Sequence, residues 1–291
     1  MATPNISNTN IGVFTELPHA QMTVERIVDR VRNARLFPQF ADVRDLDWAG
    51  AVVLDAGCGA GMKCLPLALV GAEVVGIDGS PAQASRAKAA AEALGVDAEF
   101  LVGRLENLSD LWGDRDQADL IINSAVIHHV DGWRDVIAQF EQILKPGGWL
   151  YLTWGDPSLS LCGFILKNQI AYRLGWNMRS RLKIGRALFG WWDRRRNTMD
   201  VELDSFFADL YAAYYNPIPL RTMLHELDRA NFRIAGSMPP FNLQQWLART
   251  KHNKWFLAHL GLIGDAVVRW RYFFRFRHGP RVLLCQRVKN H

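Results

Sequence analysis

The chain has 291 residues, of which 49% are apolar and 22% charged, values that are ordinary for a globular protein. No run of about 18 uninterrupted apolar residues is present, which excludes a membrane-spanning helix, and the opening residues show no signal-peptide pattern. The four cysteines form no CxxC pair, so neither a zinc ribbon nor a disulfide framework is indicated, and we expect a cytoplasmic protein.

Short β-rich runs alternate with helical patterns along the chain. Seven runs predict strands: 51–56, 73–78, 98–103, 118–124, 149–154, 232–238 and 280–288. Helical patterns lie between them, over about 62–70, 81–94, 105–112, 133–144 and 220–230. Strands that are separated by helices predict right-handed crossovers, and hence an α/β fold with a mostly parallel sheet covered on both faces.

Two of these helices carry clear end signals. Ser80 is a favourable N-cap, Pro81 fits the first helical position, and Gly95 follows the last one. Asn231 follows the helix over 220–230 and tolerates the left-handed conformation that closes a helix.

The alternating pattern stops after residue 154 and resumes in two later pieces, which indicates two insertions. We divide the chain into an N-terminal helical segment (1–50), an α/β core (51–154), a first insertion (155–216), a return to the core (217–240), a second insertion (241–279) and a last core strand (280–291). Both insertions leave the carboxyl ends of strands, where α/β sheets bind ligands, so we expect them to form a helical cap over the site.

Positive charge gathers in the two insertions. Residues 155–200 carry a net charge of +6 and residues 246–291 a net charge of +9, whereas the rest of the chain carries −10. Both segments mix arginines with Trp, Phe and Tyr. A solvated basic face explains this composition, and so does contact with an acidic or amphipathic small molecule, an anionic membrane surface or RNA. No separate RNA-binding module is visible, so we do not expect a nucleic-acid partner.

The stretch VVLDAGCGAGMK places three glycines directly after a predicted strand, at Gly57, Gly59 and Gly61. A glycine-rich turn between a strand and a helix lets a ligand lie against bare backbone. Asp55 precedes the turn, and Asp78 ends the next predicted strand, where a carboxylate can accept both hydroxyls of a ribose. The order of strand, glycine loop, helix, strand and acid predicts a nucleoside-containing ligand.

Over about residues 50–154 the sequence resembles the class I S-adenosylmethionine-dependent methyltransferases, in the motifs VLDAGCGAG, VVGIDGS, ADLIINSAVIHHV and LKPGGWLYLTW. The resemblance implies a Rossmann-like fold with a mostly parallel seven-stranded sheet, S-adenosylmethionine as cofactor and methyl transfer as the reaction. The cofactor-binding residues that it implies are Asp55, Gly57, Cys58, Gly59, Gly61, Asp78, Gly79, Arg104, Leu105, Asn123 and Ala125.

The resemblance also implies which part of the cofactor each group contacts. The glycines line the methionine and ribose parts, and Asp78 holds the ribose hydroxyls. Arg104 and Leu105 flank the adenine, although many relatives carry Asp where this chain has Arg104. Asn123 and Ala125 lie beside the methionine end.

His128 and His129 follow the fourth predicted strand, at the edge where the ligand is expected. Either would serve as a general base if the acceptor has a proton to lose. The alternative is structural, with His129 closing the loop and packing under the cofactor. The layout after residue 154 is loosely similar to that of ubiquinone-pathway O-methyltransferases, but Ala125 and His128 stand where their metal-binding carboxylates fall, so we expect no metal site.

We expect transfer of a methyl group to oxygen or nitrogen of a small or amphipathic, acidic acceptor. Candidate acceptor-lining residues are Tyr211, Tyr214, Tyr215 and His225. The alternatives are an RNA methyltransferase and a non-catalytic protein that keeps the cofactor fold for binding or scaffolding. The sequence does not specify the oligomeric state.

Overall fold

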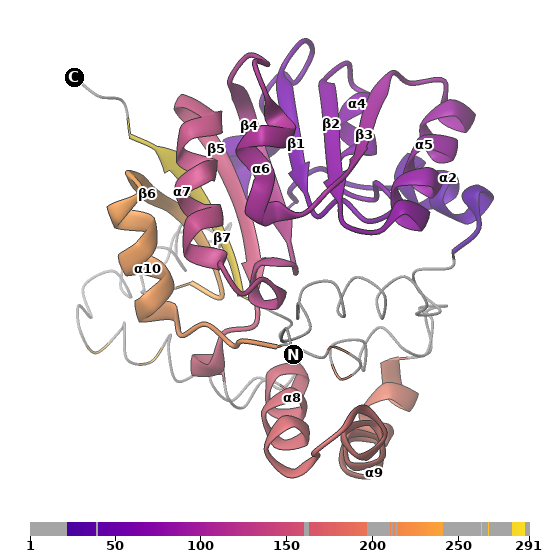
Figure 1. Cartoon of the computed structure of the whole chain (residues 1–291), viewed down its shortest axis with the longest axis vertical. Coiled ribbons are helices and arrows are strands. Elements are labelled where there is room, and N and C mark those ends of the chain that lie inside the picture. Colours follow the sequence, from indigo (N-terminus) through magenta and orange to yellow (C-terminus); the bar gives the residue numbers. More distant parts are fainter. Residues whose placement is uncertain are drawn as a thin grey trace, which may run out of the picture.

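The computed structural model of the chain contains one sheet with helices on both of its faces (Figure 1). It describes residues 22–38, 40–159, 163–196, 210, 212, 215–240, 263, 267 and 281–288. The strands are β1 (Val52–Ala56), β2 (Glu73–Asp78), β3 (Ala98–Val102), β4 (Ala118–Ser124), β5 (Leu144–Trp154), β6 (Phe232–Met238) and β7 (Arg281–Arg287). Within the described residues they form a seven-stranded sheet in the order β3-β2-β1-β4-β5-β7-β6.

All pairings from β3 to β5 are parallel, whereas β7 runs antiparallel to both of its neighbours, β5 and β6. The predicted fold class, a mostly parallel seven-stranded Rossmann-like sheet, is therefore confirmed. Because β1, β2 and β4 are parallel, the residues that follow them gather at one edge of the sheet, their carboxyl edge.

Alternation along the strands supplies a core on each face of the sheet. Leu54 and Ile121 pack on the face covered by helices α6 (Leu108–Trp112), α7 (Trp133–Ile143) and α10 (Leu220–Arg229). Val53 and Leu120 belong to the core on the other face. Among the residues that the structure describes, four more helices precede or lie within this α/β core: α2 (Val24–Arg32), α3 (Ala41–Arg44), α4 (Leu65–Ala68) and α5 (Pro81–Leu94).

The end signals read from the sequence are confirmed. The hydroxyl of Ser80 accepts a hydrogen bond from the backbone N of Gln83 at 3.3 Å, and Gly95 closes α5 with φ +69°. Asn231 follows α10 with φ +57°. The helix expected over 62–70 is shorter, because residues 61–64 form turns of the glycine loop and only α4 is helical.

The fifth strand begins five residues earlier than the sequence predicts. Leu144 pairs with Ala118, so the KPGG segment lies within β5 and does not form a separate turn before it. The register shifts between Ala118 and Leu120, which accommodates the extra residues of β5 as an irregularity in the ladder.

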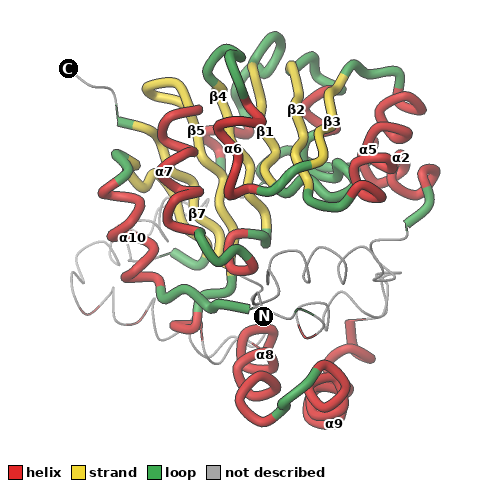
Figure 2. Tube along the Cα trace, viewed as in Figure 1, coloured by secondary structure: helices red, strands yellow, loops and turns green. Residues whose placement is uncertain are grey.

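The first insertion contributes two helices, α8 (Gly163–Leu174) and α9 (Met178–Arg196), which lie below the sheet in the view of Figures 1 and 2. Most of the second insertion, 241–279, lies outside the described residues. None of the helices in the described part of the chain has the length and apolar character needed to cross a bilayer.

Candidate active site

A hydrogen bond joins the glycine loop to Asp78 at the carboxyl edge of the sheet. Asp78, the last residue of β2, accepts from the backbone N of Gly59 at 2.8 Å through Oδ2, and from the backbone N of Ser80 at 2.8 Å through Oδ1. Burial raises the pKa of the Asp78 carboxyl, and these two hydrogen bonds oppose the shift because they stabilise the charged form. The acid and the loop therefore form one unit.

The glycines of the loop have different local reasons for lacking a side chain. A Cβ on Gly57 would lie 2.5 Å from Cγ2 of Val126, and one on Gly61 would lie 2.8 Å from Cδ1 of Leu65. At both positions the protein itself fills the space that a side chain would need. A Cβ on Gly59 would meet no atom within 4 Å, although its φ of +52° also favours glycine. Gly59 is thus the glycine whose missing side chain leaves open space, as a ligand that lies against the backbone requires.

Asp55 lies behind the glycine loop and is 1% exposed. Its Oδ2 has no hydrogen-bond partner among the described residues, and burial raises the pKa of its carboxyl to about 7. A hydrogen bond from Cys64 and the charge of Lys63 oppose this shift, whereas the charge of Asp78 adds to it. Burial likewise raises the pKa of the Cys58 and Cys64 thiols, so both cysteines are neutral core residues.

Asn123 and Ala125 lie at the end of β4 but differ in exposure. The Asn123 amide is fully buried, donates to the carbonyl of Ala56 at 2.8 Å and accepts from the backbone N of Ile127 at 3.3 Å, so it ties β1 to the loop after β4. Ala125 is exposed, has φ +61°, and donates its backbone N–H to Oγ1 of Thr153 at 2.7 Å. Its backbone conformation is one that non-glycine residues seldom adopt.

Arg104, Leu105 and Gly79 complete the set implied by the family. The Arg104 guanidinium forms an ion pair with Glu106, with Nη2 and Oε1 2.6 Å apart. Leu105 is buried, and Gly79 directly follows Asp78 and is half-buried. These residues follow β2 and β3 at the same edge as the glycine loop.

The two predicted histidines gather with one of the predicted tyrosines. The rings of His128 and His129 lie 4.2 Å apart between centroids, and Tyr215 packs at 5.3 Å and 5.8 Å from them. Nδ1 of His128 accepts from the backbone N of Gly155 at 3.4 Å, which assigns the proton of a neutral ring to Nε2. Both imidazoles are buried, at 2% and 8% exposed.

Residues of α8 and α9 extend this cluster, and sequence reasoning did not find them. Tyr172 stacks on Tyr215 at 5.2 Å, and the Arg181 guanidinium lies 4.1 Å from the Tyr172 ring centroid. Lys167 and Asn168 precede Tyr172 on α8 and are fully buried. For Asn168 and Tyr172, the available signal in the sequence was their spacing. They are four residues apart and so share one face of a helix.

Of the other predicted acceptor residues, only His225 is described, and it does not join the cluster. His225 lies on the exposed side of α10, whose buried side carries Met223 and Leu227. Tyr211 and Tyr214 lie outside the described residues. Among the side chains that the structure describes, no three His, Cys, Asp or Glu residues are placed to share a metal ion.

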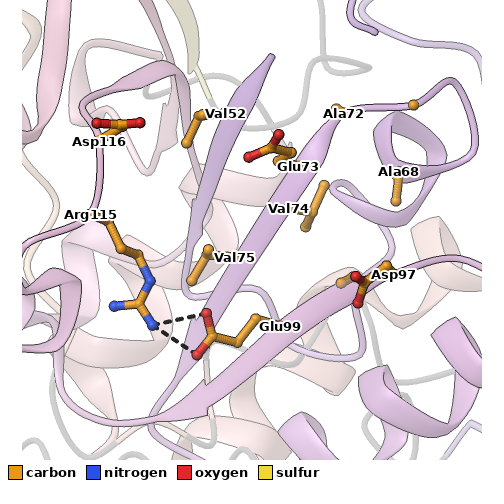
Figure 3. A pocket seen from close by; sticks show the side chains of 12 residues that line it. Val52, Ala68, Ala72, Glu73, Val74, Val75, Asp97, Glu99, Arg115 and Asp116 are labelled. Carbon is orange, nitrogen blue, oxygen red and sulfur yellow. Dashed lines mark hydrogen bonds and ion pairs between the residues drawn. The ribbon is translucent and has the colours of Figure 1, made fainter. Parts of the chain in front are cut away.

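An open hollow of about 630 Å³ lies at the opposite edge of the sheet (Figure 3). It is lined by the first residues of three strands, Val52, Glu73 and Ala98, together with acidic side chains. Arg115 forms an ion pair with Glu99 there, with Nη2 2.8 Å from Oε1. Since ligands of α/β sheets bind at the carboxyl ends of the strands, this hollow is not the candidate active site.

Comparisons with known proteins agree with the motifs and the geometry. A family model described as a methyltransferase domain matches residues 54–152. A ubiquinone biosynthesis O-methyltransferase of Chelativorans sp. (strain BNC1) is 31% identical over 193 residues, which cover 65% of this chain and 72% of that protein. In further relatives of the same name the match spans 44–64% of their length.

Two solved structures share the fold. An S-adenosylmethionine-dependent methyltransferase from Mesorhizobium loti is 19% identical, with a TM-score of 0.52 over 88% of this chain and 100% of that one. PKMT2 from Rickettsia typhi, in complex with AdoHcy, is 17% identical, with a TM-score of 0.56 over 88% of this chain and 52% of that one. Motifs, fold and relatives together show that this chain belongs to the class I S-adenosylmethionine-dependent methyltransferases.

Proposed function

We propose that this methyltransferase acts on a hydroxyl oxygen of a small amphipathic acceptor. The observation that carries the proposal is the cluster of His128, His129 and Tyr215 beside the glycine loop. The two parts are in contact through Val126, which closes the space at Gly57 and begins the turn that carries the histidines. The proposed proton acceptor and the proposed cofactor site would thus adjoin at one edge, and the curated relatives named as O-methyltransferases make oxygen the expected atom.

The residues of the loop fit the cofactor that the family uses. S-adenosylmethionine supplies an electrophilic methyl group on a positively charged sulfur. Asp78 has the carboxylate that would bind the ribose hydroxyls, and the open space at Gly59 would admit the ribose and methionine parts. Arg104 and Leu105 would flank the adenine, and Ala125 would lie at the methionine end. Asn123 would support the site without bonding to the cofactor, because its amide already forms hydrogen bonds within the protein.

His129 is the better candidate for the general base. His128 accepts a backbone hydrogen bond through Nδ1, so one of its nitrogens is committed to holding the start of the first insertion. His129 is the less buried of the two imidazoles and faces the same tyrosine ring. In this assignment His129 removes the proton of the acceptor hydroxyl, a contribution of about 10²–10⁴-fold in rate, while proximity and alignment supply the rest.

Methyl transfer to defined acceptors tests this function. The protein would be incubated with methyl-labelled S-adenosylmethionine and a panel in which one decyl chain carries a catechol, a phenol, a carboxylic acid or a primary amine. We expect label in a base-stable methyl ether of a hydroxyl acceptor. Label on the amine alone, or on added RNA alone, would replace this proposal with N-methylation or RNA methylation. Transfer of label to none of these acceptors, with no consumption of the cofactor, would favour a binding role.

A second observation favours an anionic bilayer surface as the place where the acceptor is held. The bend between α8 and α9 exposes three large apolar side chains, Leu174, Trp176 and Met178, and Trp176 is 83% exposed. Residues 157–192 contain six Lys or Arg and no Asp or Glu. Apolar side chains at a bend that lacks acidic residues fit a surface with negative headgroups above an acyl layer. We propose that this bend touches the membrane.

A further inference from the structure

A buried ion pair lies where the two insertions join the sheet. Oδ2 of Asp156 accepts from Nε of Arg281 at 2.5 Å, and the side chains of Asp156 and Arg281 are 0% and 6% exposed. Asp156 follows the end of β5 and Arg281 begins β7, so the partners are 125 residues apart in the chain. Burial lowers the pKa of Arg281, and the carboxylate of Asp156 opposes that shift.

Each residue of the pair also forms hydrogen bonds with residues where the insertions leave or rejoin the core. Oδ1 of Asp156 also accepts from the backbone N of Leu220 at 3.2 Å, at the point where the first insertion returns to α10. Nη1 of Arg281 donates to Oγ of Ser237 at 3.3 Å and to the carbonyl of Pro239 at 3.2 Å, where β6 ends and the second insertion leaves. The pair therefore contacts the exit and the return of both insertions.

A short ladder of hydrogen bonds connects the pair to the histidine cluster. The backbone N of Asn216 donates to the carbonyl of His128 at 2.8 Å, and the backbone N of Ile218 donates to the carbonyl of Gly155 at 3.1 Å. Nε1 of Trp154 donates to the carbonyl of Ile218 at 2.7 Å. This ladder fixes the segment that carries Tyr215, and the hydrogen bond from Leu220 to Asp156 ends it.

Close packing makes the position of Tyr215 sensitive to this ladder. A Cβ on Gly155 would lie 2.4 Å from the hydroxyl oxygen of Tyr215, so the phenol passes directly over the backbone next to Asp156. The stacked ring of Tyr172 holds its other side. A small displacement of the returning segment would move Tyr215 against both imidazoles.

We propose that Asp156 and Arg281 are the positioning pair of the acceptor site. They hold the ends of both insertions against β5, β6 and β7, and through the ladder they set Tyr215 over His128 and His129. Stability alone does not explain the pair, because a buried ion pair is often no more stabilising than neutral groups of the same volume. The expected effect on methyl transfer rests on the proposed function. The inference that the pair positions the ends of the insertions does not.

Four variants separate positioning from general stabilisation. Asp156→Asn keeps an acceptor for Leu220 but removes the carboxylate that faces Arg281, and Arg281→Lys keeps the charge but loses the planar fork that reaches Ser237 and Pro239. The double variant Asp156→Asn/Arg281→Gln has no unpaired buried charge. Glu141→Gln is the matched control, because it breaks the ion pair between Glu141 and Arg287 at the other end of β7, whose atoms are 2.8 Å apart.

Three measurements are made on each full-length variant: amide hydrogen exchange, calorimetry with S-adenosylhomocysteine, and kcat/KM with the decyl catechol. We expect the double variant to melt near the wild-type temperature and to keep its cofactor affinity. Its exchange should rise at 154–159, 215–221 and 236–240, and kcat/KM should fall by about 10- to 100-fold, since a displacement of about 1 Å can cost that much. Arg281→Lys should raise exchange mainly at 236–240.

Unchanged exchange at these segments in the double variant would overturn the proposal, as would the same pattern in Glu141→Gln. A double variant that restores melting temperature and kcat/KM together would also overturn it, because the pair would then only stabilise. If the wild-type protein transfers no methyl group to the catechol, the proposed acceptor fails, and the exchange data still decide whether the pair positions the insertions.

Discussion

The carboxylate of Asp78 accepts a hydrogen bond from the backbone N of Gly59 at 2.8 Å. The acid at the end of β2 thus fixes the turn of the glycine loop that has open space beside it. One residue therefore shapes the loop and offers a carboxylate at the ligand edge. Because Asp78 has both roles, cofactor binding should depend on this side chain most.

Replacing Asp78 by Ala should weaken binding of S-adenosylhomocysteine by about 1.5–3 kcal/mol, the scale for hydrogen bonds to charged groups. Isothermal titration calorimetry measures the change directly. Asp97→Ala is the control, because Asp97 is an exposed acid that lines the hollow at the opposite edge. Equal losses in the two variants would mean that net charge, and not the position of Asp78, determines binding.

Asp55 should make the stability of the ligand-free protein depend on pH. Burial raises the pKa of its carboxyl from 3.8 to about 7. Between those values the folded protein binds a proton that the unfolded chain has released, so the free energy of unfolding falls as pH rises through about 4 to 7. Asp78 contributes with the same sign, because its pKa is also raised.

Asp55→Asn should flatten this part of the pH profile, measured by urea unfolding from about pH 5 to pH 8. The variant keeps a side chain of nearly the same shape without an ionisable group. An unchanged slope in the variant would show that the Asp55 carboxyl does not retain its proton on folding.

His129→Ala should lower kcat by about 10²–10⁴-fold if its imidazole is the general base. The affinity for S-adenosylhomocysteine should stay the same, because in the proposed site the cofactor contacts the glycine loop and Asp78 and not the His129 imidazole. His128→Ala should instead lower the melting temperature, since the backbone N of Gly155 loses its acceptor. Loss of folding or of cofactor binding in His129→Ala would assign His129 the packing role.

Trp176→Ala should weaken binding to vesicles that contain phosphatidylserine by about 1–3 kcal/mol, because the exposed indole would lose its contact with the interface. Flotation of the full chain with such vesicles measures this, and raised salt should reduce binding in both proteins. Leu46→Ala is the control, because Leu46 is also exposed but lies outside the bend. Equal binding of all three proteins would remove the bend from the membrane contact.

Local signals made much of the fold predictable from the sequence. Ser80, Pro81 and Gly95 predicted the limits of α5, and Asn231 the close of α10, because each acts through the backbone of its own turn. The glycine loop was predictable for the same reason. Which glycine faces open space was not, because the answer at Gly57 depends on Val126, a side chain from the turn that follows β4.

Contacts between distant segments account for the parts of the site that the sequence did not predict. Asp156 meets Arg281 across 125 residues, and neither has a motif around it. Tyr172 joins Tyr215 only because α8 lies below the sheet in the view of Figure 1, and this helix has a buried lysine, Lys167, where an apolar residue is the usual choice. Pairings of this kind require the three-dimensional structure.

Calorimetric titration of S-adenosylhomocysteine into Gly59→Ala and Gly95→Ala tests most directly whether the cofactor lies against Gly59. Both glycines have positive φ and no atom within 4 Å of an added Cβ, so both variants carry the same backbone cost of about 1–2 kcal/mol. Only Gly59 adjoins the expected ligand. We predict that Gly59→Ala loses at least about tenfold in affinity, or 1.4 kcal/mol, while Gly95→Ala binds like the wild type. Wild-type affinity in Gly59→Ala would contradict the account.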